Sequence, residues 1–400
     1  MLKIKSEYFS DRNIATFYLF AMTVQFLYLE GWAVSTPKVV LMAISPIIWL
    51  LKKPSLTKAT FWCAAYMLVT TFTLYLQWNN VRSSTLWYSL LFFSMFNMYY
   101  SLIYVNRAFT LDYYIKLIRV VIFAFAGCLV LQQALHLVGI EYFPLVNSYT
   151  SYGRGFLAGN SLAIEPSHSA RMLTVTCYVY LRLLEIKNGG KLAFGALFID
   201  NRRTFIAFFY TMVTMGSGTA FVGLSILALY FIDRRYILPL IPFAFALYYI
   251  AANIEYEPLQ RFLDVAEASI EMDSAEMRKV DHSASSRTNV IFNSIKYFDI
   301  SDPKLLFGHG MGANWLNPKS TLDAIYNYGL ASYACKLGLF FSCCWNGLFS
   351  LPVLMFILLF SFNIGNVAYG WACLMMLATL KYFQTHRECD DDTIDNNPDL

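Results

Sequence analysis

Long apolar runs recur along this chain from Ala15 to Phe383. Many of them extend for roughly 17 to 25 residues, enough for a helix to cross a hydrocarbon core about 30 Å thick. A buried helix in a water-soluble domain would explain one such run, but not a long series. The composition agrees, because 58% of the 400 residues are hydrophobic and only 14% are charged, whereas roughly one quarter is charged in typical soluble domains. The sequence therefore predicts an all-α, multi-pass membrane protein with about twelve crossings.

The expected crossings are, in chain order, residues 15–35, 38–51, 60–77, 84–105, 118–140, 170–186, 203–215, 217–232, 236–252, 329–345, 347–362 and 366–383. The seventh and eighth are short. Gly216-Ser217-Gly218 between them is either a tight turn or a flexible point inside one long helix. A single long helix there would reverse the orientation of everything after it.

Basic residues of short loops set the expected orientation, because positive charge is retained on the cytoplasmic side. If the seventh and eighth runs form a hairpin, these residues fall on one side: Lys52, Lys53, Arg107, Lys116, Lys187, Lys191, Arg202, Arg203, Arg234 and Arg235. Both termini are then expected in the cytoplasm. Residues 1–12 lead into a full-length apolar run without a small-residue cleavage site, so no cleaved signal peptide is expected.

This topology divides the chain into six parts. They are residues 1–140 with five crossings, an outer loop 141–169, four crossings in 170–252, a large outer loop 253–328, three crossings in 329–383 and an acidic cytoplasmic tail 384–400. Helical spacing after Pro258 predicts an amphipathic helix that lies along the membrane or caps the bundle. A second loop helix is expected to start after Ser285 or Ser286 and to end before Asp302.

Cysteines and net charge point to no further chemistry. Seven of the eight cysteines lie in or at the ends of apolar runs, so we interpret the cysteines as small apolar packing residues. The net charge of +4 is modest and follows from the topology. No nucleic-acid partner is therefore expected.

The first outer loop and the start of the crossing after it hold three candidate site residues. Arg154 lies between two glycines, which allow close approach of a ligand, and its guanidinium suits phosphate oxygens; a solvated loop arginine is the alternative. Glu165 precedes Pro166 near the bilayer surface, where a carboxylate can accept a hydroxyl proton or simply satisfy the helix dipole. Arg171, at the start of a crossing, is a phosphate ligand or an interfacial arginine.

The second outer loop adds three more. Arg287 falls in the first turn of the expected loop helix, where its side chain and free backbone N–H groups can face one anion. His309 lies in Gly308-His309-Gly310-Met311-Gly312, a bend that can aim an imidazole and backbone N–H groups at one place; a plain glycine-rich turn with a solvated histidine is the alternative. Asp323 follows as a candidate substrate-binding residue.

The order of these motifs resembles the O-antigen polymerase (Wzy) family and the related O-antigen ligases. The motifs are Glu165-Pro166-Ser167, Gly216-Ser217-Gly218-Thr219-Ala220-Phe221, Ser286-Arg287, Phe307-Gly308-His309-Gly310-Met311-Gly312, Thr321-Leu322-Asp323 and Lys336-Leu337-Gly338-Leu339-Phe340. They cover about residues 140 to 345. The chain lacks the His-Asn pair that ligases usually have after the glycine motif and has Asn317 and Asp323 instead, which favours a polymerase.

The resemblance implies a GT-C-like glycosyltransferase of the bacterial inner membrane. Its reaction would transfer a glycan from undecaprenyl pyrophosphate to another lipid-linked repeat unit at the outer leaflet. That reaction needs cations on the developing diphosphate charge, a base near the acceptor hydroxyl and a groove for lipid. Arg154, Arg171 and Arg287 are the candidate cations, and Glu165 or His309 is the candidate base. The implied partners are the lipid-linked oligosaccharide, the bilayer, and a chain-length regulator and flippase of the same pathway; no metal or other cofactor is expected.

Other classes of function remain open at this point. A ligase of similar fold is one, and a polysaccharide flippase or exporter is another, although transporters usually show paired half-repeats and broken helices near the midplane. A structural membrane protein with interfacial arginines also fits the composition. Of the two candidate bases, Glu165 is preferred because it lies less than about two helical turns before Arg171, so one helix start can hold a base and a phosphate ligand together.

Overall fold

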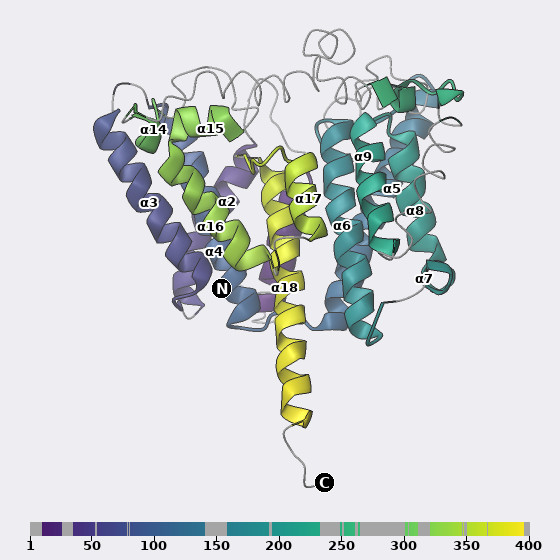
Figure 1. Cartoon of the computed structure of the whole chain (residues 1–400), viewed down its shortest axis with the longest axis horizontal. Helices are drawn as coiled ribbons and strands as arrows, with labels where there is room; N and C mark the ends of the chain where they lie inside the picture. Colours follow the sequence, from purple (N-terminus) through teal and green to yellow (C-terminus); the bar gives the residue numbers. More distant parts are fainter. Residues whose placement is uncertain are drawn as a thin grey trace, which may run out of the picture.

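A computed structural model shows the chain as a bundle of helices (Figure 1). It describes residues 10–25, 35–52, 54–77, 79, 81–140, 158–191, 194–232, 249, 252–260, 263–264, 301–302, 304–310, 321–345, 347, 350–365 and 367–395. Within these ranges the chain forms helices and turns and no strand. The predicted all-α class is confirmed for this part of the chain.

The helices of the N-terminal half are α1 (Asp11–Thr23), α2 (Thr36–Leu51), α3 (Lys58–Leu76), α4 (Ser83–Tyr104), α5 (Leu111–Leu137), α6 (Pro166–Lys187), α7 (Phe194–Asp200), α8 (Arg202–Thr214) and α9 (Gly218–Phe231). After the large loop follow α14 (Lys304–Phe307), α15 (Thr321–Tyr328), α16 (Leu330–Cys344), α17 (Leu351–Leu358) and α18 (Ala368–Asp395). The expected crossings 38–51, 60–77, 84–105, 203–215, 217–232 and 329–345 agree with α2, α3, α4, α8, α9 and α16 to within a few residues.

Local capping explains why several helices begin before their apolar runs. The Ser10 hydroxyl accepts a hydrogen bond from the Asn13 N–H at the start of α1, and Thr110 caps α5 in the same way. Thr57 and Thr60 form a reciprocal capping box at α3. Such caps satisfy N–H groups that lack a partner inside the helix. They extend the helix into polar sequence that an apolar-run argument does not count.

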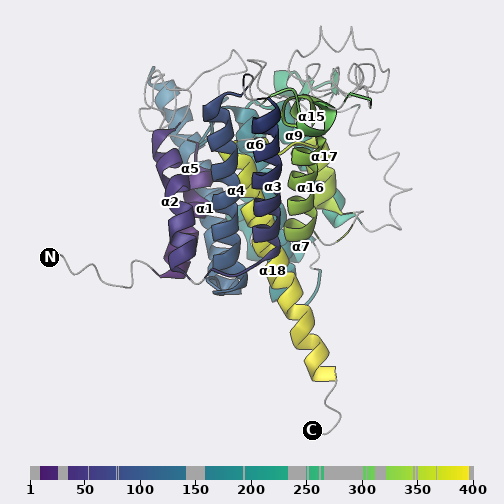
Figure 2. The same cartoon turned by 90° about the vertical axis from the view of Figure 1, so that its left-hand side faces the viewer.

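Neighbouring helices run alternately up and down in the view of Figure 1, in which α18 ends below the bundle and α14 and α15 lie above it. At the lower end Lys52 pairs with Asp11 at 2.9 Å, and Lys187 pairs with Asp112 at 2.6 Å. These pairs join the ends of α2 and α6 to the starts of α1 and α5. At the upper end the Gln25 N–H donates to the Leu162 carbonyl at 2.7 Å. Figure 2 shows the same alternation from the side.

Gly216-Ser217-Gly218 separates two helices and does not lie inside one. Gly216 has a φ of 73°, a backbone conformation that glycine adopts without strain, and α8 and α9 pack against each other. The Gly159 N–H donates to the Met215 carbonyl, which places this turn at the upper end. The Tyr230 hydroxyl near the end of α9 donates to Glu185 at 2.8 Å, close to the lower end of α6. The hairpin interpretation is therefore confirmed.

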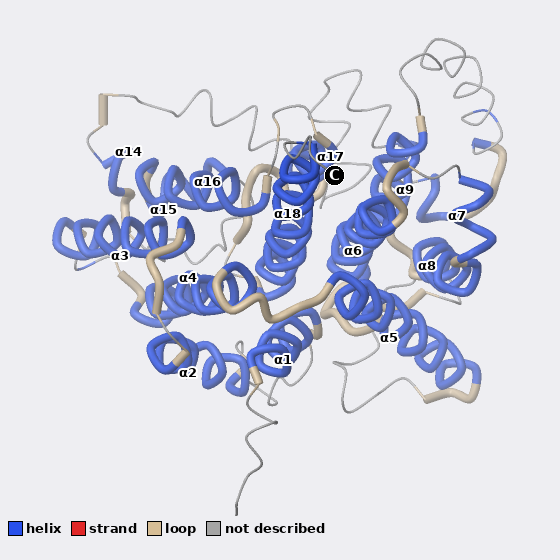
Figure 3. The backbone as a smooth tube through the Cα atoms, turned by 90° about the horizontal axis from the view of Figure 1, so that it is seen from below, coloured by secondary structure: helices blue, strands red, loops and turns tan. Residues whose placement is uncertain are grey.

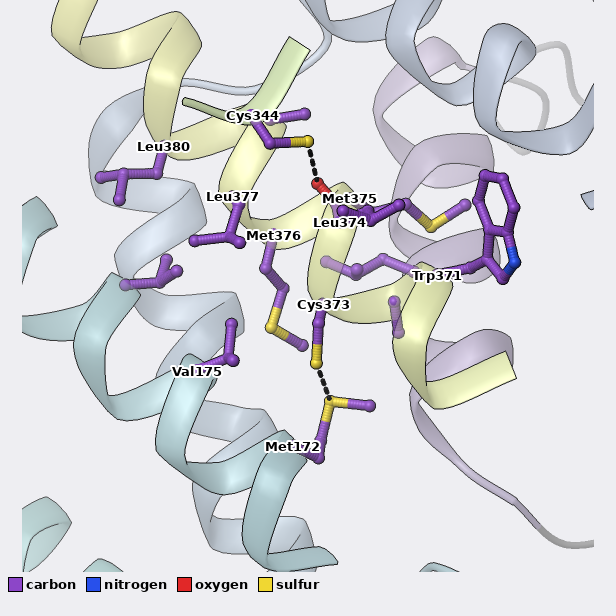
Figure 4. Packing of buried hydrophobic residues seen from close by; sticks show 14 of the residues in the cluster. Met172, Val175, Cys344, Trp371, Cys373, Leu374, Met375, Met376, Leu377 and Leu380 are labelled. Atoms are coloured by element: carbon purple, nitrogen blue, oxygen red, sulfur yellow. Dashed lines mark hydrogen bonds between the residues drawn. The ribbon is translucent and has the colours of Figure 1, made fainter. Parts of the chain in front are cut away.

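Helix α18 occupies the centre of the bundle and packs against α1, α4, α6 and α16 (Figure 3). Its Trp371 stacks on Phe92 of α4, with ring centroids 5.5 Å apart. Figure 4 shows the sulfur-rich contacts around it: Cys373 lies against Met172 of α6, and the Cys344 thiol of α16 donates to the Leu374 carbonyl. The described cysteines are unbridged, and all but Cys128 are buried, as their interpretation as packing residues requires.

Some helices differ in extent from the expected crossings. Helix α18 continues to Asp395, beyond the crossing expected at 366–383 and into the expected tail 384–400; nothing between Phe383 and Asp395 is a glycine or proline that would stop the helix. Helices α7 and α15 were not expected, because each is too short to produce a clear apolar period. Helix α17 is shorter than the run 347–362.

Other predictions fall partly outside the described residues. The ninth run, 236–252, lies almost wholly outside them, as does the helix expected after Ser285. Residues 257–260 are helical, in line with the start expected at Pro258. Within the described part, α3 and α5 are long and apolar enough to cross a membrane, and α2, α9 and α16 are apolar but shorter. The number of crossings therefore stays a prediction.

The arrangement of the helix ends leads to a topological test. A reporter fused after Asn188 at the end of α6, or after His386 in α18, is expected to report the cytoplasmic side, because basic residues gather at that end. A reporter inserted at Ser217 should report the outer side. Alkaline phosphatase and green fluorescent protein fusions measure this directly, and an outer-side signal after Asn188 would invert the proposed orientation.

Candidate functional site

Glu165 stands at the N-terminal end of α6, directly before Pro166 in the first turn. Its side chain makes no hydrogen bond to the N–H groups of the helix. Instead its carboxylate accepts from the Ser167 hydroxyl at 3.3 Å and lies 3.9 Å from Nε2 of His168. The side chain is 53% exposed. The carboxylate is therefore accessible to a proton donor and makes no capping hydrogen bond, while its position at the helix start also suits the helix dipole.

Arg171 lies less than two turns further along α6 and presents an incompletely satisfied cation. One terminal nitrogen donates to the Tyr369 hydroxyl at 2.7 Å, and the guanidinium carbon lies 6.0 Å from the centre of the Tyr369 ring. Its Nε is buried and has no hydrogen-bond partner within the described part of the chain. No described carboxylate forms an ion pair with it. A partly buried cation of this kind favours an anionic ligand.

Three further residues hold the start of α6 in place. The His168 ring stacks on the Tyr369 ring with centroids 4.4 Å apart, and His168 Nδ1 lies 3.3 Å from Oε1 of Gln25. The same Gln25 oxygen accepts from the Ile164 N–H at 3.3 Å. Residues from the end of α1, the start of α6 and the start of α18 thus meet here. We name Gln25, Glu165, His168, Arg171 and Tyr369 the α6 cluster.

His309 belongs to a different group at the upper end. Its Nδ1 lies 3.1 Å from the Tyr326 carbonyl oxygen, and its Nε2 lies 3.2 Å from a carboxylate oxygen of Asp302. The ring also stacks on the Tyr326 ring at 3.9 Å. Both ring nitrogens thus lie next to oxygen atoms of the protein. This geometry fixes the ring in place and leaves neither nitrogen pointing away from the protein.

Gly308 and Gly329 allow two backbones to cross next to His309. Their φ values are +83° and +85°, and an added Cβ would lie 2.4 Å from the Asn327 oxygen at Gly308 and 2.4 Å from the Leu306 oxygen at Gly329. The His309 N–H donates to the Tyr326 carbonyl at 2.8 Å, and the Gly310 N–H to the Asn327 carbonyl at 3.3 Å. These N–H groups are therefore engaged within the protein, and the glycines serve close packing.

The two groups lie in different parts of the bundle. Helices α14 and α15 pack with α3 and α16 on one side of α18, whereas α6 lies on the other side (Figures 1 and 3). The Thr73 hydroxyl of α3 donates to the Phe307 carbonyl at 2.9 Å, which fixes the His309 group to that side. Glu165 and Arg171 thus share a helix start, as expected, but His309 does not join them.

The remaining candidates have no described side-chain geometry. Arg154 and Arg287 lie outside the described residues, and Asp323 lies in α15, one turn before Tyr326, with its side chain likewise outside them. Sequence reasoning missed Gln25, Tyr369 and Asp302 as site residues. No local pattern marks them, because each acquires its position through a contact distant in sequence. His168 was detectable only as part of Glu165-Pro166-Ser167-His168.

Comparison with known proteins gives no assignment. No protein-family model, no curated protein and no solved structure matches this chain. The function is therefore inferred from the residues and their geometry.

The glycine crossing generates a stability prediction. Gly308→Ala and Gly329→Ala should each lower the free energy of unfolding by about 1–3 kcal/mol, because the new Cβ meets backbone atoms and the φ is unfavourable. Gly127→Ala in the middle of α5 is the matched control, since no atom lies within 4 Å of its added Cβ. It should be neutral or up to about 1 kcal/mol stabilising. Thermal unfolding of the purified proteins measures the difference, and equal midpoints for all three would contradict the crossing.

Proposed function

We propose that this chain is a multi-pass glycosyltransferase of the bacterial inner membrane that lengthens a surface polysaccharide. It transfers a glycan from undecaprenyl pyrophosphate to the sugar end of another lipid-linked repeat unit. The observation that carries the proposal is Arg171, a partly buried cation without a carboxylate partner in the described chain, held on the same helix start as the exposed carboxylate of Glu165. A departing pyrophosphate needs such a cation, and an acceptor hydroxyl needs such a base.

Outward-facing apolar side chains support the placement in a membrane. They lie on α2, α3, α5 and α8, which form the periphery of the bundle in Figure 3. Exposed examples are Val40, Ile47, Leu51, Phe61, Leu68, Val120, Val130, Leu131, Ile206 and Val213. Many exposed apolar side chains on outward-facing helices are unfavourable in water and favourable in lipid. We propose that the apolar runs make the twelve crossings expected from the sequence.

Charge at the helix ends supports the orientation. The described basic residues of the short loops lie at the lower end, where Lys52 pairs with Asp11 and Lys187 pairs with Asp112. Since positive charge in short loops stays in the cytoplasm, the upper end with the α6 cluster faces the outer leaflet. Lipid-linked repeat units are substrates at that face under this proposal.

The chemistry follows from the positions of the two groups. Glu165 accepts the proton of the acceptor hydroxyl. At the same time the hydroxyl oxygen of the acceptor forms a bond to the anomeric carbon of the donor sugar. The bond between that carbon and the pyrophosphate oxygen breaks, and undecaprenyl pyrophosphate leaves with its electron pair. Arg171, oriented by the Tyr369 hydroxyl, stabilises the charge that develops on the leaving group. Arginine can supply this stabilisation in place of a metal ion; Arg154, Arg287 and Asp323 are proposed as further substrate ligands.

Deletion of the gene tests the class of activity. Gel display of surface polysaccharide should show a ladder in the parent strain that collapses to a single repeat in the deletion strain. Loss of single-unit transfer to lipid A as well would indicate a ligase, and an unchanged ladder would exclude both activities. Accumulation of untransferred lipid-linked units on the inner side would indicate a flippase.

Arg171 generates a prediction on chain length. Arg171→Ala should lower polymerisation roughly a hundredfold or more, and Arg171→Lys should restore part of it, because the charge is kept and the planar fork is lost. Tyr369→Phe should have a smaller effect, since it removes one positioning hydrogen bond. Arg202→Ala, an exposed arginine at the lower end, is the control for loss of charge. Ladder length at matched protein level measures each, and a wild-type ladder from Arg171→Ala would remove it from the mechanism.

The base is tested by a second pair of variants. Glu165→Gln should abolish polymer while protein level and lipid-linked substrate stay unchanged, because the amide cannot accept the hydroxyl proton. His309→Ala should leave shortened but visible polymer, since its contacts hold α15 and not the reacting groups. Normal polymer from Glu165→Gln together with none from His309→Ala would reverse the two roles.

A further inference from the structure

A cavity of about 460 Å³ lies at the lower end of the bundle, where α6, α16, α17 and α18 meet. The α6 cluster is at the opposite end of the same helices. The proposed glycosyl transfer has no use for a cavity here. Its volume is within the range of roughly 300 to 1,000 Å³ that small-molecule sites usually have.

One wall of this lower cavity carries a fixed arginine. Arg182 and Glu185 of α6 both line it, and a terminal nitrogen of Arg182 donates to Glu185 at 2.5 Å. The Tyr230 hydroxyl donates to the same carboxylate oxygen at 2.8 Å. The Nε of Arg182 is buried and lacks a hydrogen-bond partner among the described residues. Glu185 thus holds the guanidinium in place without using all of its donors.

The other walls combine apolar and aromatic surface. Leu377 and Leu380 of α18 line the cavity together with Cys344 of α16, and all three are labelled in Figure 4. Trp345 also lines it and donates through its indole N–H to Ser350 at 2.6 Å. Nearby, the Lys381 ammonium donates to the Ser342 and Trp345 carbonyls at the end of α16. The cavity therefore has a polar part, in which Arg182 is paired with Glu185, and an apolar part.

We propose that the lower cavity binds the phosphate group of a membrane phospholipid, with Arg182 on the phosphate and the start of an acyl chain against Leu377 and Leu380. A free phosphate ion would gain nothing from the apolar wall, whereas a phospholipid matches both parts. Indole rings are favoured at the depth where headgroups meet acyl chains, and a guanidinium that keeps donors beyond its bond to Glu185 suits phosphate oxygens. The proposal shares with the polymerase proposal only the membrane placement.

Such a lipid would stabilise the packing of α6 against α18. It would bridge the lower ends of two helices whose upper ends form the α6 cluster. A ligand that binds the folded state alone stabilises it in proportion to the logarithm of its concentration. Occupancy is therefore expected to raise the midpoint of thermal unfolding.

Binding is measured on the full-length protein purified in a neutral detergent. The probes are phosphatidylglycerol, diacylglycerol with the same acyl chains and no phosphate, and inorganic phosphate. Phosphatidylglycerol should form adducts in native mass spectrometry and raise the unfolding midpoint by several degrees, whereas the other two should not. Equal effects of diacylglycerol would overturn the phosphate assignment, and an effect of inorganic phosphate alone would overturn the lipid assignment.

Two neighbouring substitutions on α18 locate the binding. Gln384 lines the cavity, whereas Thr385 is exposed and is not part of its lining. Gln384→Glu should weaken phosphatidylglycerol binding about tenfold, because a second carboxylate opposes the phosphate, and Thr385→Glu should change it less than about twofold. Gln384→Lys should strengthen binding.

Each substitution result has a definite meaning. Equal losses from Gln384→Glu and Thr385→Glu would show general surface charge and overturn the site. Since no glycan is present in these measurements, failure here leaves the role of the α6 cluster standing. A wild-type ladder from Arg171→Ala would equally leave the lower cavity standing.

Discussion

The central constraint on this bundle is the need to satisfy polar groups around α18, a helix enclosed on most sides by apolar neighbours. Tyrosine hydroxyls from adjacent helices do this: Tyr114 of α5 donates to the Met376 carbonyl at 3.2 Å, and Tyr104 of α4 donates to the Ala378 carbonyl at 3.3 Å. In an apolar interior a hydroxyl without a partner is costly, so these bonds fix the rotation of α18 as well as its depth. That rotation turns Tyr369 toward Arg171 and Gln384 toward the lower cavity.

Helix α6 is the second half of this arrangement. Arg171 and Arg182 are eleven residues apart, which is close to three full turns and roughly 16 Å along the axis, so both lie on the stripe that faces α18. Each has a buried Nε without a partner in the described chain. One stripe of α6 therefore meets one side of α18 at two depths, and each depth provides an arginine. The eleven-residue spacing of Arg171 and Arg182 is informative only once α18 is known to be the partner helix. In the sequence alone the spacing does not identify which helix the two arginines face.

The sequence predicted what depends on local pattern. Apolar runs located most of the described helices, and Gly216 marked the hairpin, because length, periodicity and turn chemistry act over short distances. Apolar runs did not give the extent of a helix that continues past its apolar part, as α18 does. They also did not indicate a helix that is too short to show an apolar period, such as α15. In the site, Glu165 and Arg171 were found because one helix start holds both. Gln25, Tyr369 and Asp302 were not, since each reaches its partner through tertiary packing. The glycines around His309 suggested a ligand bend, whereas Gly308 and Gly329 are required by a backbone crossing that no single segment reveals.

The degree to which each arginine is satisfied separates structural from functional roles among those of the described bundle. Arg119 of α5 donates to the Tyr180 hydroxyl through two nitrogens and to the Asn201 side chain, so its charge is well solvated by neutral acceptors. Arg182 has a carboxylate partner in Glu185 and one buried donor to spare. Arg171 has a single hydrogen bond, to a neutral hydroxyl. Because an uncompensated cation raises the energy of the unliganded protein, an anion gains most by binding at Arg171, which has no carboxylate partner in the described chain. This difference is the physical reason for proposing that the pyrophosphate binds at the upper end of α6.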